Sequence, residues 1–173
     1  MIRTWFRLAV YFIVFVLLQV LVMNNIHLFK LVTPFIYIYV LLKLPVDMTR
    51  SSVIILSFLL GLTVDIFSNT FGMHAAACSF AGFIRRLLLE RFADIKDLPE
   101  GSLPSYELFG YGKFIRYALL LTALHHLALF VIESFTFFQP LLMIIRMFSA
   151  ILFSLLLILV IEAFNLEKNG NGK

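Results

Sequence analysis

The chain has 173 residues, of which 62% are hydrophobic and 14% charged, and its formal net charge is +4. Soluble domains contain roughly 45–50% apolar and about 25% charged residues, so this composition excludes an ordinary water-soluble fold and indicates an integral membrane protein. Six spanning helices of about 20 residues would use about 120 residues, which leaves no room for a separate soluble catalytic domain.

The first expected transmembrane helix covers about residues 5–23. Arg3 and Arg7 before an apolar run imitate a signal peptide, but no small-residue cleavage site follows, so we interpret the run as an uncleaved helix. A second span is predicted over about residues 27–44. Pro34 interrupts it, which a membrane helix tolerates where neighbouring groups satisfy the freed carbonyl.

Four further spans follow in chain order. They are predicted at about residues 53–67, 72–89, 114–134 and 140–161. Because Arg85 and Arg86 shorten the uncharged part of the fourth, a re-entrant or tilted segment is an alternative there. The sequence thus predicts an all-α integral membrane protein with one six-helix transmembrane domain, residues 1–166, and a flexible polar tail, residues 167–173.

The basic residues are distributed unequally between the two sides of this layout. With six spans, Lys30 falls on the side opposite the termini and Arg146 falls inside a span, which leaves twelve of the 14 Lys and Arg residues on the side of the termini. Positive charges accumulate on the cytoplasmic side of membrane proteins, so the distribution predicts that both termini are cytoplasmic.

Several ionisable residues lie in or near the predicted spans, where they need a cavity, a partner or each other. They are Asp65, His74, His125, His126, Glu133 and Arg146. Arg146 lies deep in the sixth span, and Asp65 and Glu133 are the acids available to it in the outer half of the membrane. We expect a structural ion pair there, with a transport or proton-relay role as the alternative. The two adjacent histidines point about 100° apart on a helix and do not form a metal site by themselves.

Small residues predict close packing of the third and fourth spans. The fourth carries Gly72, Ala75, Ala76, Ser79 and Gly82 at spacings of three and four, and the third carries Gly61, Asp65 and Asn69 on one face. Small side chains let two helix backbones approach closely. Internal packing explains these residues without a ligand, and it would place Asp65 and His74 close to the outer surface.

Signatures of enzymes are absent from the sequence. There is no phosphate-binding loop, no G-x-S-x-G elbow and no H-E-x-x-H zinc motif. The single cysteine, Cys78, excludes an internal disulfide and is interpreted as a small packing residue. The hydrophilic stretch 90–112 mixes basic and acidic residues, which argues against a nucleic-acid surface. We therefore predict a protein that is not an enzyme and has no cofactor or metal.

One segment resembles a known family. Residues 61–86 read G-L-T-V-D-I-F-S-N-T-F-G-M-H-A-A-A-C-S-F-A-G-F-I-R-R. This resembles the most characteristic stretch of the rod shape-determining protein MreD family, which shows G-L-x-x-D-x-x-S, a short turn and then G-x-x-A. The matching positions are Gly61, Leu62, Asp65, Ser68, Gly72, His74 and Ala75. The turn lacks the proline of many members. The run His125 to Glu133 also looks like the fifth span of some members.

The resemblance implies a non-enzymatic subunit of the bacterial elongation machinery in the inner membrane. The family works with MreC, MreB, RodA and a penicillin-binding transpeptidase in lateral peptidoglycan synthesis and cell shape. Its bundle resembles the substrate-binding subunits of energy-coupling-factor transporters. The first hypothesis is therefore a membrane scaffold that binds MreC, in which Gly61, Asp65, Ser68 and Gly72 have structural or interface roles.

The second hypothesis is a small-molecule binding or transport subunit. Its outer cavity would be lined by Asp65, His74, His126 and Glu133. Taken together, the two hypotheses give these candidate functional residues: Gly61, Asp65, Ser68, Gly72, His74, Ala75, His126, Glu133 and Arg146.

Overall fold

The computed structural model describes residues 2–25, 33–93, 98–134 and 140–170, and these contain helices and no strand. The long helices are α1 (Ile2–Leu21), α3 (Arg50–Ser68), α4 (Met73–Phe92), α6 (Tyr111–Ser134) and α7 (Pro140–Gly170). The short ones are η1 (Met23–Asn25), α2 (Ile38–Leu42) and α5 (Tyr106–Phe109). The predicted all-α class is confirmed.

Four of these helical stretches are long and apolar enough to cross a membrane. They are Thr4–Asn25, Arg50–Ser68, Tyr111–Ser134 and Leu141–Asn165. The remaining long helix, α4, is more charged, but it is continuous over 20 residues. Such a helix is about 30 Å long, which matches the hydrocarbon core of a bilayer. The protein is therefore a helical membrane protein.

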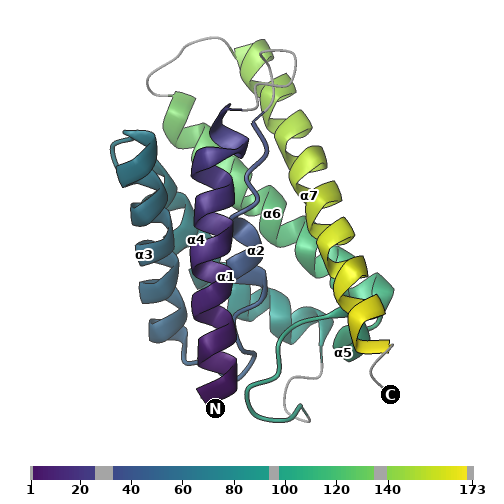
Figure 1. The fold of residues 1–173 in the computed structure, drawn as a ribbon. Coiled ribbons are helices and arrows are strands. Elements are labelled where there is room, and N and C mark those ends of the chain that lie inside the picture. The colour runs from purple at the N-terminus through teal and green to yellow at the C-terminus, as the bar shows by residue number, and fades with distance from the viewer. Residues whose placement is uncertain (1, 26–32, 94–97, 135–139, 171–173) are drawn as a thin grey trace.

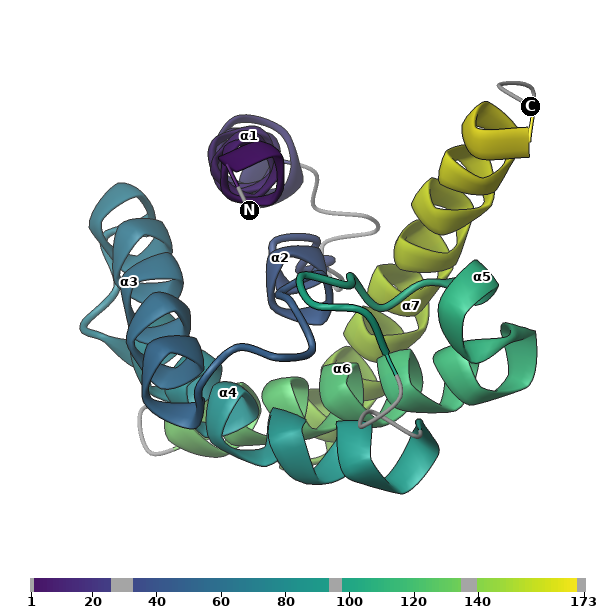
Figure 2. The same cartoon turned by 90° about the horizontal axis from the view of Figure 1, so that it is seen from below.

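The long helices form a curved row with one helix across its open side. Figure 2 shows α3, α4, α6 and α7 in the row, α2 inside the curve and α1 across the opening. Neighbours in the row pack on each other, α3 on α4, α4 on α6 and α6 on α7. The first turn of α1 and the last turn of α7 lie at the same end of the bundle (Figure 1).

The second predicted span is not a continuous helix. Its first part, residues 27–32, lies outside the described residues, and residues 33–35 have no helical structure. Only α2 is helical in the rest of the segment. Pro34 has no N–H to donate and disfavours the helical conformation of the residue before it, so the chain reaches α2 in an extended form. Non-helical backbone at membrane depth is stable only inside protein, and α2 is completely buried.

The sixth predicted span is longer than expected. We predicted a flexible tail from residue 167, whereas α7 continues to Gly170. Glu167 and Lys168 are good helix formers, so the polar sequence extends the helix beyond the apolar stretch. The end of the predicted tail, residues 171–173, lies outside the described residues.

The predicted close packing of the third and fourth spans is confirmed at two glycines. A Cβ atom built on Gly61 would lie 2.6 Å from the Cα atom of Ala75. A Cβ atom on Gly82 would lie 2.9 Å from the Cβ atom of Ser57. Real Cβ atoms do not approach other atoms so closely. Gly61 therefore lets the backbones of α3 and α4 touch, and Gly82 leaves the space that the Ser57 side chain of α3 occupies.

Candidate functional site: the buried polar core

Asp65 caps the helix that follows it. Its Oδ2 accepts a hydrogen bond from Ala75 N at 2.8 Å, and its Oδ1 accepts from His74 N at 3.1 Å and from the Thr70 hydroxyl. The chain reverses between α3 and α4 through Asn69 and Gly72, whose φ angles are 54° and 76°. A carboxylate at a helix N-terminus bonds unpaired N–H groups and interacts favourably with the helix dipole. Asp65 thus closes the hairpin.

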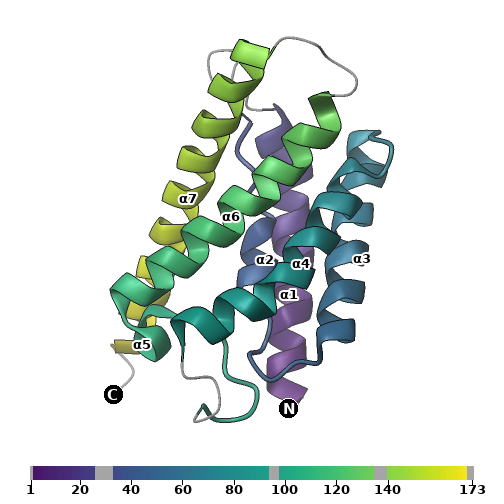
Figure 3. The same ribbon diagram turned by 180° about the vertical axis from the view of Figure 1, so that it is seen from behind.

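The structural ion pair expected between Arg146 and one of two acids, Asp65 or Glu133, does not form with Asp65. Asp65 is 2% exposed and its carboxylate is occupied by the hairpin, while Arg146 belongs to α7 at the other end of the curved row. Figure 3 shows that α4 and α6 lie between α3 and α7. Arg146 also makes no ion pair with Glu133 within the described part of the chain. The two acids and the arginine were expected together because all lie in the outer half, but the helix order separates Asp65 from the others.

The hydroxyl of Tyr37 joins two histidines at the centre of the bundle. It lies 2.8 Å from His74 Nδ1 and 2.9 Å from His125 Nε2. Cys78 Sγ lies 3.7 Å from His125 Nε2, and Cys78 is a buried free cysteine, as its predicted packing role requires. Tyr37 immediately precedes α2, so the broken second span places this hydroxyl between α4 and α6.

His126 forms hydrogen bonds with one residue of its own helix, α6, and with one residue of α7. Its Nδ1 lies 2.8 Å from the Thr122 carbonyl, and its Nε2 lies 3.2 Å from Ser154 Oγ. Ser154 Oγ also accepts from Phe35 N at 2.8 Å. Because a carbonyl only accepts, Nδ1 of His126 carries a proton and donates it to the Thr122 carbonyl. The imidazole connects α6 to α7, and Ser154 connects both helices to the segment before α2.

Gln19 of α1 binds the other backbone groups of that extended segment. Its Oε1 accepts from Ile36 N at 2.9 Å and its Nε2 donates to Pro34 O at 3.3 Å. Nε2 also donates to Asn24 Oδ1 at 2.9 Å, and Asn24 Nδ2 donates to Ser68 Oγ at 2.8 Å. Ser68, a candidate residue, therefore connects the end of α3 to η1. The side chains compensate for the helical hydrogen bonds that this segment lacks.

Arg85 binds the other end of the broken span. Its Nη1 lies 3.5 Å from Pro45 O, its Nη2 donates to Leu44 O, and its Nε donates to Tyr117 Oη at 3.1 Å. Tyr117 in turn donates to Leu42 O at 3.3 Å. Carbonyls after a helix end have no helical partner and carry partial negative charge, which suits a cation. Arg85 is 2% exposed and makes no ion pair among the described residues.

Lys43 and Glu162 form a second buried cluster near the end of the bundle that holds the termini. Lys43 Nζ lies 2.8 Å from Glu162 Oε1 and 2.6 Å from Pro104 O. Tyr39 donates to Glu162 Oε2 at 2.8 Å and accepts from Asn165 Nδ2 at 2.9 Å. The sequence analysis did not predict this cluster. A signal for it was present, since Glu162 is an acid at the end of an otherwise apolar stretch.

Three of the four residues expected to line an outer cavity form hydrogen bonds inside the bundle. Asp65, His74 and His126 are buried and engaged in the hydrogen bonds above, and His74 and His126 lie on either side of Phe35, with ring centroids 5.4 and 5.3 Å from it. Glu133 lies in the last turn of α6. Among the described residues, no group of three His, Cys, Asp or Glu side chains could hold a metal ion. The polar core therefore determines the shape of the bundle.

Comparisons of the chain with family models, with curated proteins and with solved structures give no match.

Proposed function

We propose that this chain is a non-enzymatic adaptor of the MreD family that binds MreC in the bacterial inner membrane, with both termini in the cytoplasm. In this role it works with MreB, RodA and a penicillin-binding transpeptidase in lateral peptidoglycan synthesis and cell shape. The observation that best supports the proposal is the hairpin of α3 and α4. The residues that resemble the family are the ones that build this hairpin, with Asp65 as its cap, Gly61 at the helix contact and Gly72 in the turn.

Lateral contact within the bilayer is the proposed mechanism. The polar side chains described above form hydrogen bonds inside the bundle, whereas large apolar side chains of α3 and α4, among them Ile55, Ile66 and Phe80, are exposed. Phe67, which is 61% exposed, and the fully exposed Phe71 flank the hairpin turn. In lipid, helices associate by packing and not by hydrophobic transfer, so aromatic side chains next to a compact turn offer contact area to a partner helix.

Co-purification with MreC tests the proposal. The tagged chain and MreC would be produced together, extracted in a mild detergent and quantified, and cell shape would be scored in a rod-shaped host that depends on the chain. We expect a stoichiometric complex and rod-shaped cells. Phe67→Ala and Phe71→Ala should weaken the complex and round the cells, because they remove contact area without changing the buried core.

Phe148→Ala is the matched control. Phe148 is also a strongly exposed phenylalanine, but it lies on α7, away from the hairpin. It should leave the complex and cell shape unchanged at equal protein levels. Absence of MreC from the wild-type preparation, together with normal cell shape after loss of the chain, would disprove the adaptor role.

A further inference from the structure

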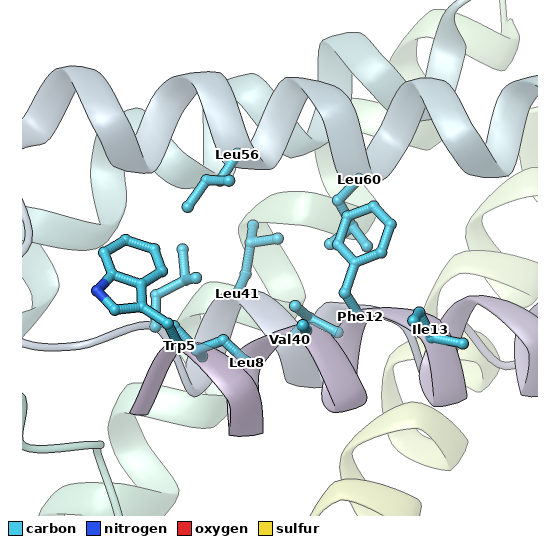
Figure 4. A pocket seen from close by; sticks show the side chains of 10 residues that line it. Trp5, Leu8, Phe12, Ile13, Val40, Leu41, Leu56 and Leu60 are labelled. Atoms are coloured by element: carbon cyan, nitrogen blue, oxygen red, sulfur yellow. The ribbon is translucent and has the colours of Figure 1, made fainter. Parts of the chain in front are cut away.

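An apolar pocket of about 340 Å³ lies between α1, α2 and α3 (Figure 4). Leu8 and Phe12 line it from α1, Val40 and Leu41 from α2, and Leu56 and Leu60 from α3. Trp5 and Ile13 also line it and are 53% and 58% exposed, so the pocket reaches the surface of the bundle. Its volume is at the lower end of the range of about 300–1,000 Å³ found for small-molecule sites.

A smaller pocket of about 130 Å³, whose lining includes two acids, adjoins the apolar one. Trp5 lines both, and the lining continues along the chain from Leu44 in the first pocket to Pro45 in the second. Asp47 and Glu100 are the acids of the second pocket and are exposed. Tryptophan favours the boundary between hydrocarbon and water. The two pockets thus form one amphipathic depression, apolar between the helices and acidic at the membrane surface.

We propose that this depression binds one phospholipid, with an acyl chain between α1 and α3 and a primary ammonium headgroup at Asp47 and Glu100. A hydrocarbon chain fits an apolar pocket that opens toward lipid, because it fills the space with dispersion contacts. Neither carboxylate forms an ion pair within the described part of the chain. They would attract an ammonium group and repel an anionic headgroup, and N–H donors can hydrogen-bond to them.

Lipid retention measured by native mass spectrometry tests this site independently of the adaptor role. The full chain would be purified in mild detergent with equal amounts of phosphatidylethanolamine, phosphatidylcholine and phosphatidylglycerol of identical acyl chains. We expect one retained lipid per chain and about threefold more phosphatidylethanolamine than either other lipid. A preference of this size corresponds to the small free energy that an ion pair at an exposed surface contributes. Equal retention of the three lipids would overturn the headgroup assignment.

Variants separate the two parts of the site. Asp47→Asn with Glu100→Gln should abolish the preference for phosphatidylethanolamine, while Glu107→Gln, at an exposed acid outside both pockets, should keep it. Ala9→Phe fills the apolar pocket from α1 and should lower total retention about tenfold. Val10→Phe, on the same helix but outside the lining, should retain lipid like the wild type.

The filling variant is informative only if it folds, so its melting temperature must match that of Val10→Phe. Leu56→Trp fills the same pocket from α3 and provides a second variant if Ala9→Phe fails to fold. Unchanged retention in a folded filling variant would overturn the acyl-chain site. A filling variant that keeps its lipid but loses a co-purifying membrane partner would also overturn it and assign the groove to a partner helix.

Discussion

Lys43 and Glu162 lie 119 positions apart in the chain and form an ion pair of 2.8 Å in which both side chains are almost fully buried. The pair connects the end of α2 to α7. Pro104 O and the hydroxyl of Tyr39 complete the hydrogen bonding around it. Burial removes both charges from water, and the remaining hydrogen bonds compensate for that loss.

Removing Glu162 should destabilise the protein strongly. Glu162→Ala leaves a buried ammonium group without a counter-ion, so we expect the free energy of unfolding to fall by about 3–5 kcal/mol. The double variant Lys43→Met with Glu162→Leu removes both charges and should recover most of this loss. Reversible unfolding in mixed micelles measures both effects. Additive losses in the double variant would show that the two residues are not coupled.

Gly61 and Gly112 should respond oppositely to alanine. Gly61→Ala pushes a methyl group against the backbone of α4 and should cost about 1–3 kcal/mol. No atom lies within 4 Å of a Cβ built on Gly112, in the first turn of α6, so Gly112→Ala should be neutral or stabilising by up to about 1 kcal/mol. Melting temperatures in one detergent would compare them, and equal effects would contradict the close contact.

The sequence predicted α1, α3, α6 and α7 because each is an apolar stretch of sufficient length, a local property of the chain. The break at Pro34 depends on partners elsewhere in the chain. Gln19 and Ser154 accept hydrogen bonds from the backbone N–H groups of Ile36 and Phe35, which have no helical partner. Hydropathy alone does not reveal such partners. The second span was therefore predicted as a transmembrane helix interrupted at Pro34, and not as a non-helical segment followed by a short helix.

Partners in the polar core were harder to predict than the helices. Asp65 and the turn that it caps are close in the sequence, so the hairpin and its small-residue contacts were predictable. The prediction that Arg146 pairs with Asp65 or Glu133 used depth in the membrane only. Depth does not specify which helices are neighbours, and α4 and α6 separate the two residues.

Asp65 and Arg146 should therefore contribute to stability independently. Asp65→Ala leaves the N–H groups of His74 and Ala75 without their acceptor and should cost about 2–3 kcal/mol. Asp65→Asn keeps one acceptor oxygen and should cost less. In a double-variant cycle with Arg146→Met, the coupling free energy should stay within about 0.5 kcal/mol. A larger coupling free energy, measured by reversible unfolding in mixed micelles, would show that Asp65 and Arg146 do interact.

Tyr37→Phe tests the centre of the bundle. A hydroxyl has one proton, so Tyr37 donates to one of the two facing nitrogens of His74 and His125 and accepts from the other. Removing the hydroxyl leaves both buried nitrogens without this partner and should cost about 1–3 kcal/mol. Nitrogen NMR of the imidazole rings should show changed signals for His74 and His125.

Two comparisons make this last experiment specific. The signals of His126 should stay in place, because its partners Thr122 and Ser154 do not involve Tyr37. Tyr11→Phe is the matched substitution, since Tyr11 packs edge to face on Tyr39 and its hydroxyl makes no hydrogen bond within the described part of the chain. It should change stability by no more than about 0.5 kcal/mol. Equal losses in the two phenylalanine variants would mean that ring packing, and not the hydroxyl between the histidines, holds the broken span in the bundle.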